Sequence, residues 1–254
     1  HSMELFSDTF TFLAGVPAIA GLLVTAAAIF LTSDWRLSLT ALLVQYVLVG
    51  LTLTRFVQAE LAIVKILVGV LAVSILYLSG RRFKDASASQ ENGADGRQFL
   101  GIQVGWQAGP LGLGLRILTV IMVALAAILF FDEYRSLLPV LDGEQPAVPP
   151  DIAFVSLWLA AMGVIGLVLS GDPLRVAPAV LTILTAFDLV YAGLEPNLAA
   201  VGLMAAVTLM AALAFGYLVT VQGLREQATQ EQSGAQAMPA TVPAATGREE
   251  GGAG

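Results

Sequence analysis

The sequence predicts an all-α, polytopic integral membrane protein with about seven transmembrane helices. The first observation is composition: the 254 residues are 57% hydrophobic and 12% charged, whereas a soluble domain carries about 25% charged residues. The second is a series of apolar stretches that approach the roughly 17–25 residues needed to cross a bilayer. The third is that turn-forming residues separate several of these stretches. Together they predict helices that use lipid as their solvent.

The apolar stretches follow one another closely along the chain. The turn TRFVQAE joins the second stretch to the third, SGDP at 170–173 joins the fifth to the sixth, and LEPN at 194–197 joins the sixth to the seventh. Gly, Asp, Pro and Asn favour turns for known backbone reasons, so these neighbours are predicted to be antiparallel hairpins. In chain order the stretches lie near residues 11–32, 38–56, 58–80, 115–132, 152–170, 174–194 and 198–222.

We predict one transmembrane helical domain over residues 11–225, with long loops at 81–114 and 133–151. Residues 1–10 comprise the apparent cloning remnant HSM and a short N-terminus that starts at Met3. Because MELFSD is acidic where a signal peptide is basic, no cleavable signal is expected. Residues 226–254 are rich in Gln, Ala, Gly, Pro and Glu without periodicity, and are predicted to be a disordered tail.

The composition also argues against several kinds of metal, cofactor and catalytic site. The chain has no cysteine, and its one histidine, His1, lies in the remnant. We therefore expect no disulfide, haem, iron–sulfur or zinc ligation and no Ser–His catalysis, and predict no catalytic residue, metal or cofactor on this chain. The net charge of −7 argues against a nucleic-acid partner. The partner that the composition predicts is the lipid bilayer.

Lysine and arginine are distributed unequally between the two sides of the predicted membrane. If the N-terminus is outside, the outer segments hold only Arg55 and Arg135. Such a bias sets orientation, so we predict N-out and C-in in the cell membrane. We interpret Arg36, Arg81, Arg82 and Arg175 as topology anchors. The inner segments hold Arg36, Arg81, Arg82, Lys84, Arg97, Arg116, Arg175, Arg225 and Arg248.

One charge lies inside an apolar stretch. Lys65 is about eight residues into the third stretch, roughly 12 Å below the outer boundary at a helical rise of about 1.5 Å per residue. An unpaired lysine at the bilayer centre costs about 2.5–3.5 kcal/mol. Asp188 has a similar depth in the sixth stretch, Glu60 is about one turn above Lys65, and Gln45 lies toward the inner side of the second stretch. Pro178, early in the sixth, leaves a backbone carbonyl free.

Two interpretations of Lys65 are open. In the first, its ammonium group snorkels to the membrane surface while Asp188 caps or hydrogen-bonds a neighbour. In the second, Lys65 and Asp188 pair inside the bundle, and together with Gln45 and Glu60 they are candidates for a proton or ion relay.

Two regions of the sequence resemble a known family of membrane subunits. DWRLSLTALLVQYVLVG, followed by AIVKILVGVLAVSILYLSGRR, resembles component E of group-four hydrogenases and formate hydrogenlyases. VLSGDPLRVAPAVLTILTAFDLVYAGL is similar to a helix hairpin of the K-type subunit of complex I and the C-type subunit of multisubunit sodium/proton antiporters. The first match is carried by Trp35, Arg36, Leu37, Ser38, Gln45, Lys65 and Arg81, and the second by Leu174, Arg175 and Asp188.

The resemblance implies a small integral membrane subunit beside large antiporter-like subunits of an ion- or proton-translocating oxidoreductase. It implies that electron-transfer cofactors sit in other subunits and that Lys65 is a charged relay element. The K-type subunits carry relay glutamates in this hairpin, whereas residues 179–187 have none and Asp188 is the acidic residue here. Two alternatives stay open: a stand-alone seven-helix protein, such as a small transporter with a midplane cavity and broken helices, and a scaffold without transport.

Overall fold

The computed structural model is helical through almost all of the part of the chain that it describes. Seven α-helices follow one another, and a pair of two-residue strands separates α5 from α6. The described residues are 15–32, 34–55, 59–91, 110–137, 140–141, 145–146, 148–170, 173–194 and 197–237. The elements are α2 (Val16–Leu31), α3 (Trp35–Leu53), α4 (Ala59–Glu91), α5 (Pro110–Ser136), β1 (Val140–Leu141), β2 (Gln145–Pro146), α6 (Pro150–Leu169), α7 (Pro173–Leu194) and α8 (Leu198–Ala237).

Six of these helices are long and apolar enough to cross a membrane, and the apolar part of α2, Pro17–Leu31, is shorter. The predicted all-α, multi-pass membrane class is therefore confirmed. Of the predicted first stretch, residues 11–14 lie outside the described residues. The six candidate spans are Trp35–Leu53, Glu60–Arg81, Leu113–Tyr134, Pro150–Leu169, Leu174–Leu194 and Ala199–Arg225.

Local sequence explains where several helices begin. Proline is favoured in the first turn of a helix, because its missing N–H has no intrahelical partner there. Pro150 opens α6 and Pro173 opens α7. The start of α3 is capped by Asp34, whose side chain accepts a hydrogen bond from the backbone N–H of Arg36 at 3.2 Å. The Asp34 cap and the proline at the start of α7 begin new helices soon after α2 and α6 end, so α2–α3 and α6–α7 are hairpins.

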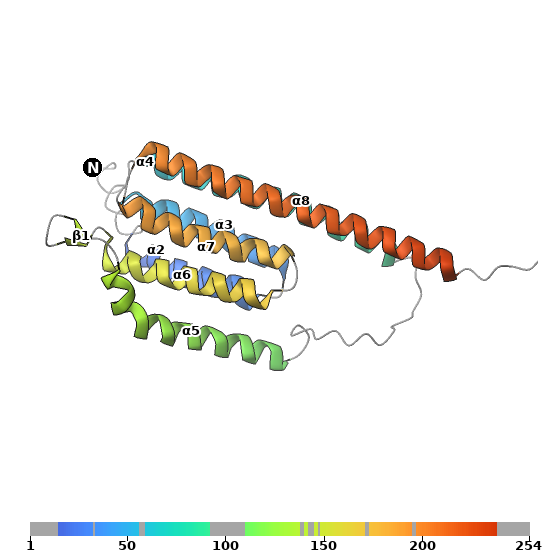
Figure 1. Cartoon of the computed structure of the whole chain (residues 1–254), viewed down its shortest axis with the longest axis horizontal. Coiled ribbons are helices and arrows are strands. Elements are labelled where there is room, and N and C mark those ends of the chain that lie inside the picture. Colours follow the sequence, from blue (N-terminus) through green and yellow to red (C-terminus); the bar gives the residue numbers. More distant parts are fainter. Residues whose placement is uncertain are drawn as a thin grey trace, which may run out of the picture.

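The helices form two layers (Figure 1). One layer holds α2, α3 and α4 side by side, and the other holds α6, α7 and α8, with α5 beside α6. Contacts of α2 with α6, α3 with α7 and α4 with α8 join the layers. Because α3 and α7 both begin at the end of the bundle where α2 and α6 finish, they run in the same direction through its centre.

Small residues let the two layers and their hairpins pack closely. A Cβ atom on Gly163 of α6 would lie 2.9 Å from the carbonyl oxygen of Ala179 in α7. On Gly216 of α8, it would lie 2.9 Å from the hydroxyl oxygen of Ser79 in α4. Glycine at these positions permits the close helix approach that is typical of membrane bundles, where packing rather than the hydrophobic effect drives association.

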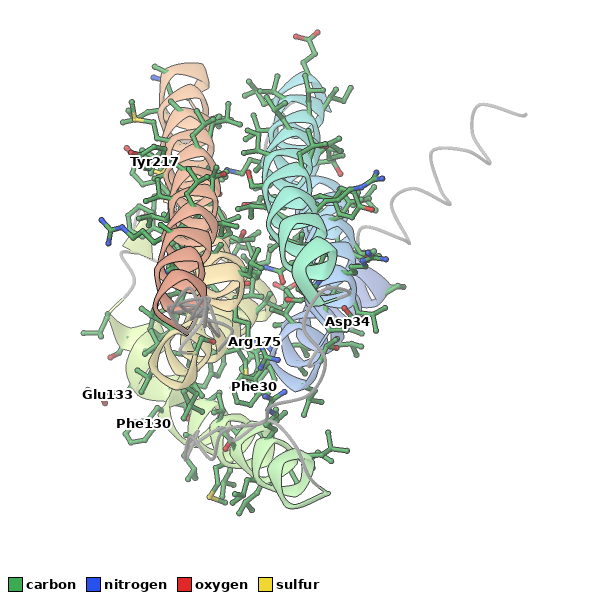
Figure 2. The ribbon with its side chains drawn as sticks, turned by 90° about the vertical axis from the view of Figure 1, so that its right-hand side faces the viewer. Phe30, Asp34, Phe130, Glu133, Arg175 and Tyr217 are labelled. Carbon is green, nitrogen blue, oxygen red and sulfur yellow. The ribbon has the colours of Figure 1, made fainter. Side chains whose placement is uncertain are left out.

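The outer faces of α4, α5 and α8 are strongly apolar. Figure 2 shows Phe130 on α5 and Tyr217 on α8 directed away from the bundle, and both side chains are exposed. Exposed apolar surface of this extent is unusual for a soluble monomer. It suits acyl chains or the helices of another membrane chain. Further exposed apolar residues include Leu67, Leu71, Leu78, Leu118, Ile128, Leu129, Leu203 and Met210.

Several predicted helix ends and loops were wrong. α4 continues to Glu91 and α8 to Ala237, so helix replaces the start of the predicted loop 81–114 and part of the predicted disordered tail. α5 also begins earlier, at Pro110, and ends later, at Ser136. Proline-free segments rich in Arg, Gln, Glu and Ala continue a helix after its apolar part has ended, because these residues are good helix formers. Residues 92–109 and 238–254 lie outside the described residues.

Candidate functional site

Lys65 of α4 and Asp188 of α7 form an ion pair inside the bundle. The Nζ atom of Lys65 contacts the Oδ2 atom of Asp188. Lys65 is 1% exposed and Asp188 is 5% exposed. A snorkelling lysine would carry its ammonium group to the surface, so of the two interpretations the structure supports the internal pair. The relay role remains a prediction.

Helical periodicity explains why both side chains face inward. Lys65 shares one face of α4 with other buried residues, whereas Val64 and Leu67 are exposed on another face. The buried residues of α4 recur every three or four positions, which is the spacing of a single helix face. They include Leu61, Ala62, Lys65, Val68, Ala72, Val73 and Leu76.

The ion pair lies between the middle of the bundle and the end at which α4 begins and α7 finishes. Lys65 is about 8 Å along the helix axis from Glu60, which begins the apolar span of α4. Asp188 is about 9 Å from Leu194, where α7 ends. Along the helix, Lys65 is therefore closer to the start of its apolar span than the predicted 12 Å, because that span begins at Glu60. Both groups nevertheless lie within helices of spanning length.

A small cavity adjoins the ion pair. Its volume is about 20 Å³, which is enough for a single water-sized probe. Side chains from α3, α4, α7 and α8 form its wall, so four helices meet at the pair. The lining residues are Leu53, Lys65, Asp188, Tyr191, Ala192, Val201 and Met204.

From Asp188, buried polar side chains continue along α7 and α3 toward the other end of the bundle. Thr185 and Thr182 precede Asp188 on the same face of α7, at helical spacing. Tyr46 of α3 lies close enough to interact with both Thr185 and Asp188. Six residues, which we call the polar row, are all buried: Asp188, Thr185, Tyr46, Gln45, Thr182 and Ser38.

Hydrogen bonding within the polar row is incomplete. Thr182 and Thr185 donate to the carbonyl oxygens of Pro178 at 2.8 Å and Leu181 at 2.7 Å. Among the described residues, neither amide atom of Gln45 has a hydrogen-bond partner. Leaving such a group buried and unbonded costs about 1–3 kcal/mol. A native core that retains this cost calls for an explanation beyond packing.

The other predicted site residues are spread over the bundle. Glu60 is exposed at the start of α4, on a different face from Lys65, so the structure does not bring it into the polar row. The guanidinium of Arg36 lies 5.5 Å from the ring centroid of Trp35, and Arg81 is exposed near the same end. Arg175 lines a second cavity. The side chain of Arg82 lies outside the described part of the chain.

Pro178 lies inside α7, as its sequence position predicted. Its ring nitrogen carries no hydrogen, so it donates no bond to the helix. The Pro178 carbonyl accepts the hydroxyl of Thr182, a member of the polar row. The proline therefore lies directly beside the row.

Sequence reasoning missed Tyr46, Thr182 and Thr185. The available signal was the spacing of Thr182, Thr185 and Asp188, which places three polar groups on one helix face. Tyr46 had a weaker signal, as the neighbour of Gln45. Hydroxyl side chains are common in membrane helices because they bond the carbonyl one turn earlier, so spacing alone does not distinguish a functional row from ordinary packing.

The two ends of the bundle carry different charges in the described part of the chain. Arg36, Arg81 and Arg175 lie at or near the end where α2 and α6 finish, and Arg116 and Arg225 lie toward it. At the opposite end, Arg55 pairs with Asp151 at 2.7 Å, and Glu60, Asp132 and Glu133 lie near helix ends there. This separation agrees with the arginine bias in the sequence. The side of the membrane that each end faces stays a prediction.

Comparison of the chain with protein-family models, with curated proteins and with solved structures found no match. Within the described ranges, no group of three or more His, Cys, Asp or Glu side chains is placed to hold a metal ion. The polar groups that stand out inside the bundle are therefore the Lys65–Asp188 pair and the polar row, and a function for the chain has to account for them.

Proposed function

We propose that the chain is a small integral membrane subunit of an ion- or proton-translocating oxidoreductase of the hydrogenase or complex I type, or of an antiporter-like complex, in which it contributes scaffold and a polar relay. The observation that carries the proposal is the ion pair of Lys65 and Asp188, buried between α4 and α7 within spanning helices. Ionisable groups at such depth are costly and mark proton or ion pathways.

The chemistry of the pair suits a relay. The ammonium of Lys65 favours the ionised form of the Asp188 carboxylate, because opposite charges attract strongly at low dielectric. If the ammonium moves away or gives up its proton, the carboxylate can accept a proton or a cation. The adjacent cavity of about 20 Å³ gives a water molecule or a small ion room to approach.

The polar row provides a direction for transfer. The hydroxyls of Tyr46, Thr182 and Thr185 both donate and accept hydrogen bonds, and so does the amide of Gln45. These groups extend from Asp188 toward the arginine-rich end of the bundle. With water between them, they form a chain of alternating donors and acceptors through a core whose other buried residues are mostly apolar.

The apolar faces of α4, α5 and α8 give larger membrane subunits a surface on which to pack, in addition to the lipid. In this proposal the electron-transfer cofactors lie in other subunits, as the resemblance to component E implies. The chain lies N-out and C-in in the cell membrane, with its arginine-rich end in the cytoplasm.

Co-purification tests the proposal. A C-terminally tagged chain, extracted from its native host in a mild detergent, is expected to bring with it larger membrane subunits and at least one subunit with a redox cofactor. Mass spectrometry and visible absorption identify them, and an untagged culture processed in parallel is the control. Recovery of the tagged chain alone, as a monodisperse species, would count against the complex and favour a stand-alone membrane protein.

A further inference from the structure

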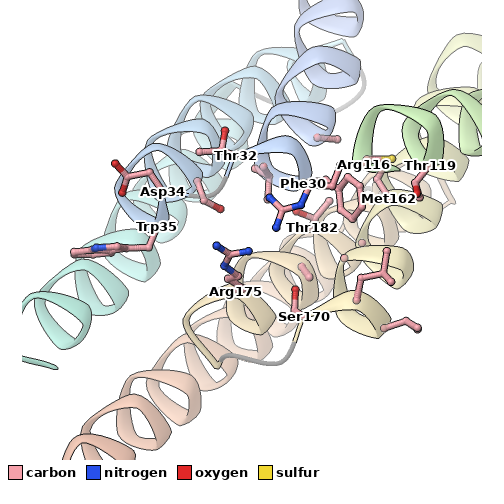
Figure 3. Close-up of a pocket in the computed structure, with 18 residues that line it drawn as sticks. Phe30, Thr32, Asp34, Trp35, Arg116, Thr119, Met162, Ser170, Arg175 and Thr182 are labelled. Carbon is pink, nitrogen blue, oxygen red and sulfur yellow. The ribbon is translucent and has the colours of Figure 1, made fainter. Parts of the chain in front are cut away.

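A second and larger cavity lies at the arginine-rich end of the bundle (Figure 3). Its volume is about 240 Å³, many times the roughly 30 Å³ that one water molecule occupies in the liquid. Five helices contribute to its wall: α2, α3, α5, α6 and α7. Hydroxyl groups in the wall come from Thr32, Ser38, Thr119, Ser170 and Thr182.

Two arginines of this wall converge on the same space. Arg116 comes from α5 and Arg175 from the first turn of α7, and both guanidinium groups point into the cavity (Figure 3). They are close enough for the charge of one to act on the other. Arg116 also donates from Nη1 to the carbonyl oxygen of Leu31 at 3.3 Å, which ties its guanidinium to the end of α2.

We propose that this cavity binds the phosphate group of an anionic membrane lipid between Arg116 and Arg175. Two cations facing one space repel each other, and an anion between them turns that repulsion into two attractions. Arginine binds phosphate with two parallel N–H donors, which fixes its orientation as well as its charge. Basic pockets between transmembrane helices are known to accept the head groups of anionic lipids.

The apolar part of the wall favours a lipid over a free phosphate ion. Phe30 and Met162 line the cavity, and Val168 and Leu169 line it while remaining exposed on the outside of α6. A phosphate held by the arginines would therefore have apolar surface beside it, along which an acyl chain can lie. Free inorganic phosphate uses the charges but gains nothing from this surface.

Among the described residues that line the cavity, Asp34 is the acidic one. Its carboxylate accepts a hydrogen bond from the backbone N–H of Arg36 and caps α3. Because the side chain is exposed, water and salt screen its charge. The repulsion between Asp34 and an anion in the cavity is therefore weaker than the attraction of that anion to the two half-buried guanidinium groups.

Lipid binding to the purified, delipidated chain in a neutral detergent tests the inference without any assay of transport. The probes are short-chain phosphatidylglycerol, short-chain phosphatidylcholine and inorganic phosphate, and binding is followed by native mass spectrometry and thermal unfolding. Phosphatidylglycerol is expected to bind saturably and at least about tenfold more tightly than phosphatidylcholine. Equal binding of the two lipids would overturn the proposal. Inorganic phosphate that displaces phosphatidylglycerol at a similar concentration would show that the site takes free phosphate instead.

The double variant Arg116→Gln/Arg175→Gln is expected to weaken phosphatidylglycerol binding about 30-fold, from about 1 kcal/mol per arginine. The matched control is Arg36→Gln/Arg81→Gln, which removes the same charge near the same end but outside the cavity, and should retain affinity within about threefold. Equal losses in both would show attraction to a basic surface rather than a site, and would overturn the inference. If the first variant does not fold, Arg116→Lys/Arg175→Lys keeps the charge and should still lose preference for phosphatidylglycerol; unchanged preference would contradict the two-arginine site.

Discussion

Replacing Lys65 by methionine is expected to lower the free energy of unfolding by about 3–5 kcal/mol, because it leaves the carboxylate of Asp188 buried without its partner. Methionine keeps much of the length of the lysine stem, so the loss reports the charge rather than a cavity. Replacing both residues, as in Lys65→Met/Asp188→Leu, removes the two charges together. A well-packed apolar pair often restores or exceeds the stability of a buried ion pair, so the double variant should recover to within about 1 kcal/mol of wild type or better.

Unfolding of the variants in bicelles gives the coupling free energy of the pair through a double-mutant cycle. The chain supplies its own control, since Arg55 and Asp151 form a second ion pair in which both side chains are 34% exposed. An exposed pair contributes about 0–1 kcal/mol, so the cycle of Arg55→Met and Asp151→Leu should give a small coupling. Additive effects at Lys65 and Asp188 would show that the two residues do not interact.

Replacing Gln45 by leucine is expected to have opposite effects on stability and on transport. Gln45 is 0% exposed, and its amide has no hydrogen-bond partner among the described residues. Leucine has a similar size and no polar atom to desolvate, so the free energy of unfolding should rise by about 1–3 kcal/mol. If the amide contacts a proton in transit, the leucine variant loses that contact. The loss of a contact that lowers the barrier by about 1.4 kcal/mol is expected to slow translocation about tenfold.

The stability of Gln45→Leu is measured on the purified chain, and its transport on the co-purified complex in proteoliposomes with a pH-sensitive dye. Thr208→Val is the matched control, because Thr208 is buried in α8 outside the polar row and its hydroxyl donates to the carbonyl of Met204 at 2.9 Å. It should leave transport unchanged and alter stability by about 1 kcal/mol at most. Greater stability of Gln45→Leu with full transport would make the buried amide a packing feature rather than part of a relay.

The ion pair could be proposed from the sequence because charged side chains are rare and costly within apolar membrane-spanning stretches. A lysine and an aspartate at similar depth in two apolar stretches are each costly alone, and each is the obvious partner of the other. Glu60 was a further relay candidate about one turn above Lys65, but helical periodicity turns it away from the buried face that holds Lys65. Depth and helix face therefore favour the same carboxylate, that of Asp188, as the partner of the lysine.

The polar row and the arginine cavity were harder to predict, for different reasons. The hydroxyls of Thr182 and Thr185 each donate a hydrogen bond to a carbonyl of their own helix. Their burial therefore costs little and does not by itself indicate a functional role. Arg116 was assigned only to the predicted inner segments, as part of the positive bias. The predicted stretch 115–132 already contained Arg116, but the sequence did not show that its guanidinium and that of Arg175 line the same cavity. The approach of the two arginines to each other depends on how five helices pack.

The most direct test of the central claim is a distance measurement between Lys65 and Asp188 in a lipid bilayer. Lys65 and Lys84 are the two lysines of the chain, so a Lys84→Arg variant leaves one lysine ammonium for ¹⁵N labelling beside ¹³C-labelled aspartates. Solid-state NMR dipolar recoupling should detect strong dephasing between that nitrogen and one carboxyl carbon, and Asp188→Asn should abolish it. A lysine nitrogen with no carboxyl carbon within direct contact would contradict the buried ion pair and the relay built on it.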